Sequence, residues 1–166
     1  MVKFLYSVLV FLTLNSQLSI AQTQKMLSIV EATKGLDLSK PDNSTLGFIG
    51  TRCGVLYMTI SGYFASNANK DSERKIAEDF YKRSEIFSFV GIYVDTNVNK
   101  KSNDAIKSQG DALSKAYIDE MLSGKRLNND VFTELIKSDV NFCSNQMASY
   151  AYLYKTIYDS ANTGKK

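Results

Sequence analysis

The chain has 166 residues, of which 44% are hydrophobic and 22% are charged, and its formal net charge at pH 7 is +3. Its basic residues are scattered, which argues against a surface that follows nucleic-acid phosphates. There is no histidine, and this excludes Ser-His-acid and Cys-His catalytic sets and the histidine-containing zinc and haem sites. We therefore expect no nucleic-acid partner, no metal, no cofactor and no catalytic set.

The N-terminus has the pattern of a secretory signal peptide. Lys3 is followed by the apolar run 4–14 and by a small-residue cleavage region that ends at Ala21. The apolar run of about 11 residues is shorter than the roughly 20 residues of a membrane helix. We expect that residues 1–21 are removed and that 22–166 form a single helical domain. The protein would then be periplasmic or extracellular, without a stable membrane span.

The sequence contains two cysteines, Cys53 and Cys143. An exported protein meets an oxidising compartment, so we predict a disulfide between them, with two separate buried thiols as the alternative. In the loop-entropy account a bridge across this separation stabilises the fold by about 4–5 kcal/mol. A nucleophilic role is not expected because no histidine can serve as the base.

The apolar patterns indicate an all-α protein, a four- to five-helix bundle in which the disulfide joins the first main helix to the C-terminal helix. Proline occurs once, at Pro41, and the patterns downstream of it have a helical period. Residues 22–43 form a lead-in with one short candidate helix near residues 26–34.

The first main helix is expected to begin at Ser44, as its N-cap, and to run to about Asn67. A neighbouring strip carries small residues that would let a partner helix approach closely. The main apolar stripe has three- and four-residue spacing and consists of Leu46, Ile49, Cys53, Leu56, Ile60 and Tyr63, and the neighbouring strip of Gly47, Gly50, Gly54, Tyr57 and Ser61.

Arg52 lies in the middle of this apolar helix and bears on whether the helix crosses a membrane. A guanidinium in the hydrocarbon costs about 3 kcal/mol on insertion scales, so a core helix is favoured over a membrane span. An unpaired buried charge is also unfavourable. We therefore expect Arg52 to have a carboxylate partner or an edge position, with a ligand-gripping role as the alternative.

A second helix is predicted over about residues 71–95 and a third over about 103–122, where Ser123-Gly124 would act as a stop signal. The end of the second, 86–94, also suits a strand by propensity, but its pattern continues unbroken from upstream. The predicted inner lines are Ile76, Phe80, Phe87, Val90 and Val94 in the second helix, and Ile106, Leu113, Tyr117 and Met121 in the third.

The last region has helical spacing from about residue 129 to 160, followed by a flexible tail, 160–166. It is either one continuous helix or two pieces divided by a cap at Ser138-Asp139. A continuous helix in an up-down-up-down bundle would lie antiparallel to the first main helix, whereas a split one could run parallel to it. Both arrangements permit the disulfide.

The candidate site is a groove between the first main helix and the C-terminal helix. Tyrosine has an apolar ring and a polar tip, so it suits a partner surface, although helical spacing of aromatics is also the ordinary sign of core packing. The predicted groove residues are Arg52, Tyr57, Tyr150 and Tyr154.

The leading hypothesis is an exported bundle that binds a protein partner or an amphipathic small molecule, and not an enzyme. The alternatives are a carboxylate-dependent hydrolase with a cleft between helices, and a structural envelope component. A facing pair of acids in a pocket would favour the hydrolase, and an exposed apolar groove would favour binding. Asn43-Ser44-Thr45 also fits the N-glycosylation triplet.

Overall fold

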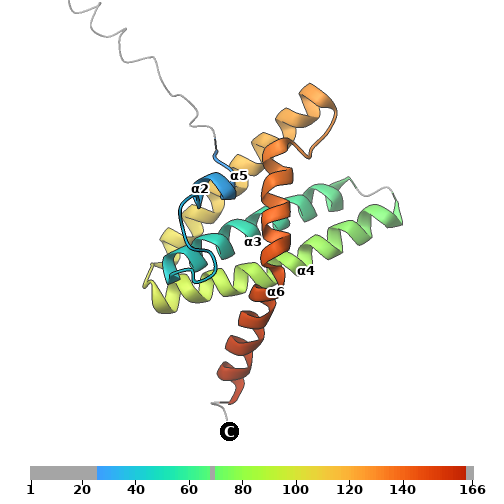
Figure 1. The fold of residues 1–166 in the computed structure, drawn as a ribbon. Helices are drawn as coiled ribbons and strands as arrows, with labels where there is room; N and C mark the ends of the chain where they lie inside the picture. The colour runs from blue at the N-terminus through green and yellow to red at the C-terminus, as the bar shows by residue number, and fades with distance from the viewer. Residues whose placement is uncertain (1–25, 68–69, 164–166) are drawn as a thin grey trace, which may run out of the picture.

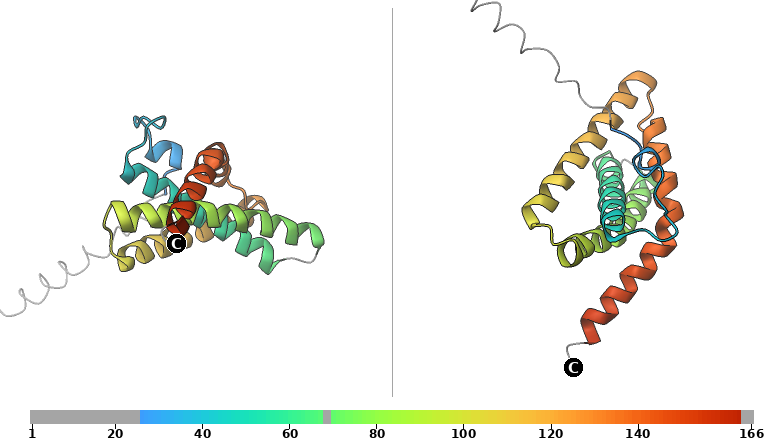
Figure 2. Two further views of the ribbon diagram at one scale, coloured as in Figure 1. Left: turned by 90° about the horizontal axis from the view of Figure 1, so that it is seen from below. Right: turned by 60° about the vertical axis from the view of Figure 1, so that its left-hand side comes forward.

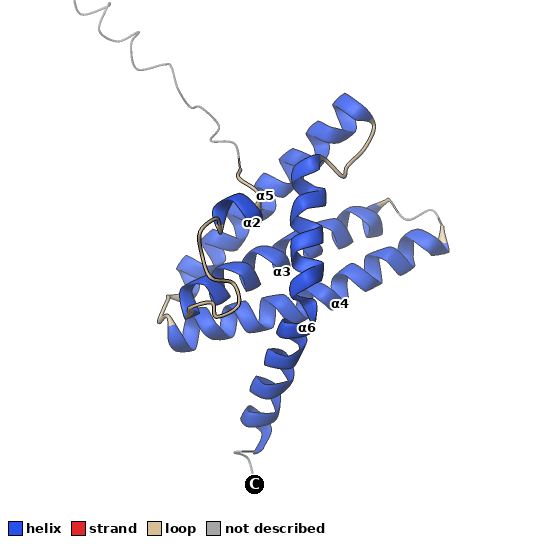
Figure 3. Ribbon diagram, in the orientation of Figure 1, coloured by secondary structure: helices blue, strands red, loops and turns tan. Residues whose placement is uncertain are grey.

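The computed structural model describes residues 26–67 and 70–163, and these residues form helices and loops without any strand (Figures 1 and 3). The predicted all-α class is confirmed. The predicted signal peptide, 1–21, lies outside the described residues. The elements are α2 (Ile29–Ala32), α3 (Asn43–Ser66), α4 (Asp71–Tyr93), the π-helix η2 (Val94–Val98), α5 (Asn103–Asn128) and α6 (Glu134–Thr163).

Helices α3 and α4 form a close antiparallel hairpin, and α5 and α6 form the two arms of a V around it. The arms meet near the loop between residues 128 and 134, and the hairpin lies between them (Figure 2, right). The buried apolar side chains fill the space where these helices meet. They include Ile29, Ile49, Cys53, Leu56, Tyr57, Ile60, Phe87, Val90, Tyr117, Met121, Ile136, Cys143 and Tyr150.

The predicted small-residue strip of α3 is its contact with α4. A Cβ on Gly50 would lie only 2.7 Å from the Cα of Gly91, and a Cβ on Gly54 would lie 2.9 Å from the backbone nitrogen of Ser88. These separations are shorter than real Cβ contacts allow, so the two backbones approach as closely as they do because the side chains are missing.

The inner face of α4 differs from the prediction near its N-terminus. Phe87, Val90 and Val94 are buried as expected, but Ile76 is 39% exposed. Ala77 faces α3 instead, and its carbonyl accepts a 2.8 Å hydrogen bond from the hydroxyl of Ser61. Alanine is small enough to allow this close contact. At the N-terminal end of α4 the inner face therefore includes Ala77 in place of the predicted Ile76.

The N-cap of α3 is Asp42 and not Ser44. The Asp42 side chain accepts a 2.7 Å hydrogen bond from the backbone N–H of Thr45. An aspartate is as good a cap as serine and also places negative charge at the positive end of the helix. The helix therefore begins at Asn43, one residue before the predicted cap.

The prediction that Ser123-Gly124 ends the third helix is wrong, because α5 continues to Asn128. A Cβ on Gly124 would meet the carbonyl oxygen of Asp130 and Cγ2 of Thr133 at 2.5 Å, so this glycine makes room for the loop that follows α5. The C-cap of the helix is Asn129, which takes the left-handed conformation, with φ of 55°. Asparagine tolerates that conformation better than most residues.

The last helix is continuous from Glu134 to Thr163. It crosses the α3–α4 hairpin steeply instead of lying antiparallel along α3, and its C-terminal half projects beyond the hairpin (Figures 1 and 2). The physical reason is the bulk of the aromatic side chains beneath it. Tyr150 of α6 packs on Phe87 of α4 with ring centroids 4.6 Å apart, which favours contact with α4 as well as α3.

Candidate functional site

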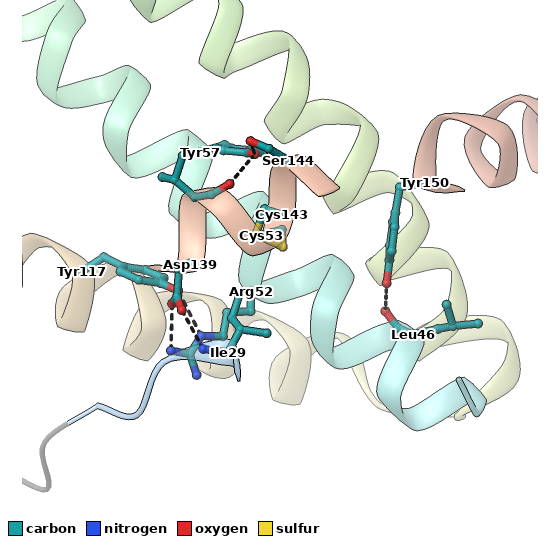
Figure 4. The surroundings of a disulfide bond; sticks show 11 residues. Ile29, Leu46, Arg52, Cys53, Tyr57, Tyr117, Asp139, Cys143, Ser144 and Tyr150 are labelled. Carbon is teal, nitrogen blue, oxygen red and sulfur yellow. Dashed lines mark hydrogen bonds and ion pairs between the residues drawn. A yellow bond between two sulfur atoms is a disulfide. The ribbon is translucent and has the colours of Figure 1, made fainter. Parts of the chain in front are cut away.

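Arg52 is buried at the centre of the molecule and has a carboxylate partner there. Arg52 is only 4% exposed. Its Nη2 lies 3.0 Å from Oδ2 of Asp139, which is fully buried. Figure 4 shows the pair where α3 and α6 cross. The expectation that Arg52 needs a carboxylate or an edge position is met by the carboxylate.

Asp139 is the acceptor that joins four separate parts of the fold. Its Oδ1 accepts from the backbone N–H of Ile29 at 2.6 Å, and its Oδ2 accepts from the hydroxyl of Tyr117 at 2.6 Å as well as from Arg52. Arg52 donates in turn to the Tyr117 oxygen at 3.0 Å and to the carbonyl of Leu27. These groups satisfy one another, so the network stabilises the fold and offers no open position to a ligand.

The predicted disulfide is present between Cys53 of α3 and Cys143 of α6, with their Cα atoms 5.7 Å apart. Both cysteines are fully buried. The bridge is adjacent in sequence to Arg52 and lies one helical turn after Asp139, so the covalent and ionic links between α3 and α6 occur at the same crossing (Figure 4).

The predicted groove residues do not line one groove. Tyr57 is fully buried and exchanges a 3.1 Å hydrogen bond with Ser144. Tyr150 is 1% exposed and donates to the carbonyl of Leu46 at 2.7 Å. Burial raises the pKa of both tyrosines. Arg52, Tyr57 and Tyr150 are therefore buried residues. For the two tyrosines, helical spacing is the ordinary sign of core packing.

Tyr154 lies one helical turn after Tyr150 on the same face of α6 and is half-buried. Its ring packs against Phe89 of α4 with a centroid distance of 4.9 Å and stacks on Tyr158 at 6.0 Å. Tyr150 contributes one wall of a separate hollow of about 570 Å³ beside Pro41. The structure thus separates the candidate tyrosines into core and surface positions.

An open groove lies between α3 and α5, and it was not predicted from the sequence. Its volume is about 620 Å³, which is within the range of small-molecule sites. Met58, Ile118 and Leu122 remain 44%, 44% and 49% exposed along it. The apolar lining consists of Val55, Met58, Tyr63, Ile118, Met121 and Leu122.

Glycines and small polar side chains complete the lining of this groove. No atom lies within 4 Å of where a Cβ would be on Gly62 or Gly110, so the space above both is open. Asp111 is the one carboxylate in the lining, and Lys107 forms a 2.6 Å ion pair with it. The small polar side chains are Thr59, Ser66, Asn67, Ser88 and Ser114. The groove is therefore largely apolar, with hydrogen-bonding groups along its edges.

A signal for this groove was present in the sequence but not used. Ile118 and Leu122 are four residues apart, off the predicted inner line of their helix, and Met58 is off the main stripe of its helix. Apolar residues at helical spacing outside the core line indicate a second apolar face. What could not be read from the sequence is that the faces of α3 and α5 lie together.

A second fully buried carboxylate, Asp95, lies at the junction of α3 and η2. Lys101 forms a 3.0 Å ion pair with it, and the amide of Asn99 donates to it at 2.8 Å. A Cβ on Gly47 would meet this carboxylate, so the glycine leaves space for it. Neither buried aspartate lines the α3–α5 groove. Within the described residues, no cluster of three potential metal ligands occurs.

Comparisons with known proteins give no relative: no protein-family model matches the chain, and no similar curated protein or solved structure was found. Among residues 26–67 and 70–163, no helix combines the length and the apolar character that a membrane crossing requires. The function therefore has to be argued from the groove itself.

Proposed function

We propose that the protein is an exported binding module that holds an amphipathic small molecule in the α3–α5 groove. The observation that carries the proposal is the groove, with a volume of about 620 Å³ and with Met58, Ile118 and Leu122 left half-exposed along it. Apolar surface of this kind is normally covered in a folded protein, and burial of it by a ligand is favourable at about 25 cal/mol per Å².

The residue types in the groove suit a small ligand better than a rigid protein surface. Met58 and Met121 have flexible, polarisable side chains that adapt to irregular apolar shapes. Gly62 and Gly110 keep the groove open at the level of the backbone. The hydroxyl and amide groups at the edges can pair with the polar part of an amphipathic molecule.

The hydrolase alternative is less well supported. Such an enzyme needs two carboxyl groups that face each other across the substrate. The α3–α5 groove is lined by one carboxylate, Asp111, which is paired with Lys107 at the surface. A purely structural envelope component does not require an open apolar groove. We therefore favour binding as the function.

Export is part of the proposal and has separate support. The N-terminal pattern 1–21 is that of a signal peptide. A buried disulfide between Cys53 and Cys143 is typical of proteins that fold in an oxidising compartment. Both observations support the proposed periplasmic or extracellular localisation.

The test is a binding titration with a neutral fluorescent apolar dye, N-phenyl-naphthylamine, on the purified exported protein. The wild-type protein should enhance the dye fluorescence saturably. Gly62→Leu places a side chain in the open groove and should weaken binding by at least about tenfold, which corresponds to 1.4 kcal/mol. The same change should not lower stability, because leucine is a better helix former than glycine.

The matched control is Ala112→Leu, which adds the same side chain to an exposed position of α5 outside the groove lining. Its dye affinity should equal that of the wild type. Absence of saturable binding to the wild type would overturn the proposal, and so would equal affinities of the Gly62→Leu and wild-type proteins.

A further inference from the structure

A second hollow lies beside the α3–α5 groove, near the C-terminal end of α5. Leu122 lines both spaces. The second hollow has a volume of about 440 Å³, and its other lining residues are Asp119, Lys125 and Arg126. An apolar surface therefore leads directly to a surface with two basic side chains.

The charge at this end of the groove is positive. Asp119 is neutralised by an ion pair with Lys115 on the same helix. Lys125 and Arg126 are exposed, and neither forms an ion pair with any residue that the structure describes. Their position in the last turn of α5 stabilises the helix end, but it leaves their N–H donors available.

The opposite end of the groove carries no net charge, because its carboxylate is paired with Lys107. Asp111 lies there, and at a rise of about 1.5 Å per residue it is about 20 Å along α5 from Lys125 and Arg126. Asp111 is paired there with Lys107, so a negatively charged head group gains nothing at that end and is favoured beside the two cations. The groove therefore has an electrostatic direction.

We infer that the ligand is a free single-chain amphiphile with an anionic head, of the fatty-acid class. Its alkyl chain lies against Met58, Ile118 and Leu122, and its carboxylate is held by Lys125 and Arg126. The planar guanidinium of Arg126 can donate two parallel hydrogen bonds to a carboxylate. This inference rests on the proposed function and adds the charge and the orientation of the ligand.

The experiment compares the displacement of N-phenyl-naphthylamine by laurate and by dodecanol, which have the same chain length and differ in the charge of the head. The wild-type protein should bind laurate about tenfold more tightly than dodecanol, and added salt should reduce the difference. The double variant Lys125→Gln/Arg126→Gln should lose the preference for laurate and keep its affinity for the dye and for dodecanol.

The matched control is Lys34→Gln/Lys40→Gln, which removes two exposed positive charges outside both hollows. It should keep the laurate preference. That result would show that the preference depends on Lys125 and Arg126 and not on the net charge of the protein. The inference is overturned if the wild type does not prefer laurate, if the Lys125/Arg126 double variant retains the preference, or if the protein binds anionic vesicles but not free laurate.

Failure of the inference and failure of the proposed function are distinguishable in the same assay. If dye and dodecanol bind and Gly62→Leu weakens both, while laurate shows no advantage, the groove is a binding site without an anion-holding end. If neither dye nor alkyl compounds bind the wild type, both proposals are wrong.

Discussion

Asp139 compensates the only charge that α3 carries into the core. It pairs with Arg52 and accepts hydrogen bonds from Ile29 and Tyr117 at the same time. Removing one partner of such a pair leaves an uncompensated buried charge, which is far more unfavourable than the pair is favourable. The stability of the crossing therefore depends on this one side chain.

We predict that Asp139→Asn lowers the free energy of unfolding by about 3–5 kcal/mol. The measurement is urea denaturation followed by far-UV circular dichroism. The control is Asp111→Asn, which removes a carboxylate from an exposed pair with Lys107 and should change stability by no more than about 1 kcal/mol. Equal effects of the two substitutions would show that the buried network does not have the role described.

Alkaline pH should unfold the protein through its buried tyrosines. Burial raises the pKa of Tyr57, Tyr117 and Tyr150 above their ordinary value, whereas tyrosines of the unfolded chain ionise near pH 10. Above about pH 10 the unfolded state holds fewer protons than the folded state, so the free energy of unfolding falls as pH rises. Below that pH the contribution of these groups is constant.

Tyrosinate absorbance and far-UV circular dichroism, recorded together, measure this effect. The buried tyrosines should ionise only as the helices unfold. Ionisation of all tyrosines near pH 10 with full retention of helix would contradict the burial described.

Part of this residue-scale picture can be predicted from the sequence. We expected an arginine inside an apolar helix to have a carboxylate partner or a position at the edge of the core, and Arg52 has the carboxylate partner. The partner could not be named, because Asp139 is 87 residues from Arg52 and its neighbour Ser138 made the pair look like a helix cap. A carboxylate inside the apolar stripe of the last helix was the usable signal, since buried charges are normally paired.

The contact between α3 and α4 is close and depends on missing side chains. A Cβ on Gly50 would collide with the backbone of Gly91, and backbone atoms cannot move aside as a flexible side chain can. By contrast, a Cβ on Gly62 of the same helix would meet open space. The same substitution should therefore have opposite effects at these positions.

We predict that Gly50→Ala destabilises the protein by about 1–3 kcal/mol, because the helices must separate. Gly62→Ala should stabilise it by up to about 1 kcal/mol, since alanine has the higher helix propensity. Thermal unfolding of the two variants and the wild type measures both. A stabilising effect of Gly50→Ala would contradict the close approach of the helices.

At the element scale the existence of the helices follows from periodicity, and their ends follow from tertiary contacts. The three- and four-residue spacing predicted each long helix, and the small-residue strip predicted a close partner. Gly124 resembled a stop signal, but its missing side chain accommodates the loop after α5. Only the packed structure distinguishes a glycine that ends a helix from one that makes space.

At the scale of the whole molecule, the disulfide fixes how α6 crosses the hairpin. We predict that Cys53→Ala/Cys143→Ala lowers the free energy of unfolding by about 2–5 kcal/mol, because the unfolded chain regains a long open loop. Urea denaturation measures the change. The wild-type protein should show no free thiol when denatured without reductant, and detection of two free thiols would contradict the bridge.

The sequence predicted the covalent link between α3 and α6 but not the direction of α6 or the site. Periodicity assigns each helix an inner face and does not specify the crossing angle. Helices α5 and α6 form a V around the hairpin (Figure 2), and the α3–α5 groove is lined mainly by residues of α3 and α5. Tyr57, one of the predicted groove residues, is fully buried in the core, and periodicity alone does not distinguish a core position from a groove position.

A methionine-methyl NMR titration of the exported protein with laurate tests directly whether the α3–α5 groove is the binding site. Met58 and Met121 line the groove, whereas Met26 and Met147 pack elsewhere against the core. Saturable shifts of the Met58 and Met121 methyl signals, with Met26 and Met147 unchanged, are predicted. Shifts confined to Met26 or Met147, or no shift at saturating laurate, would contradict the account.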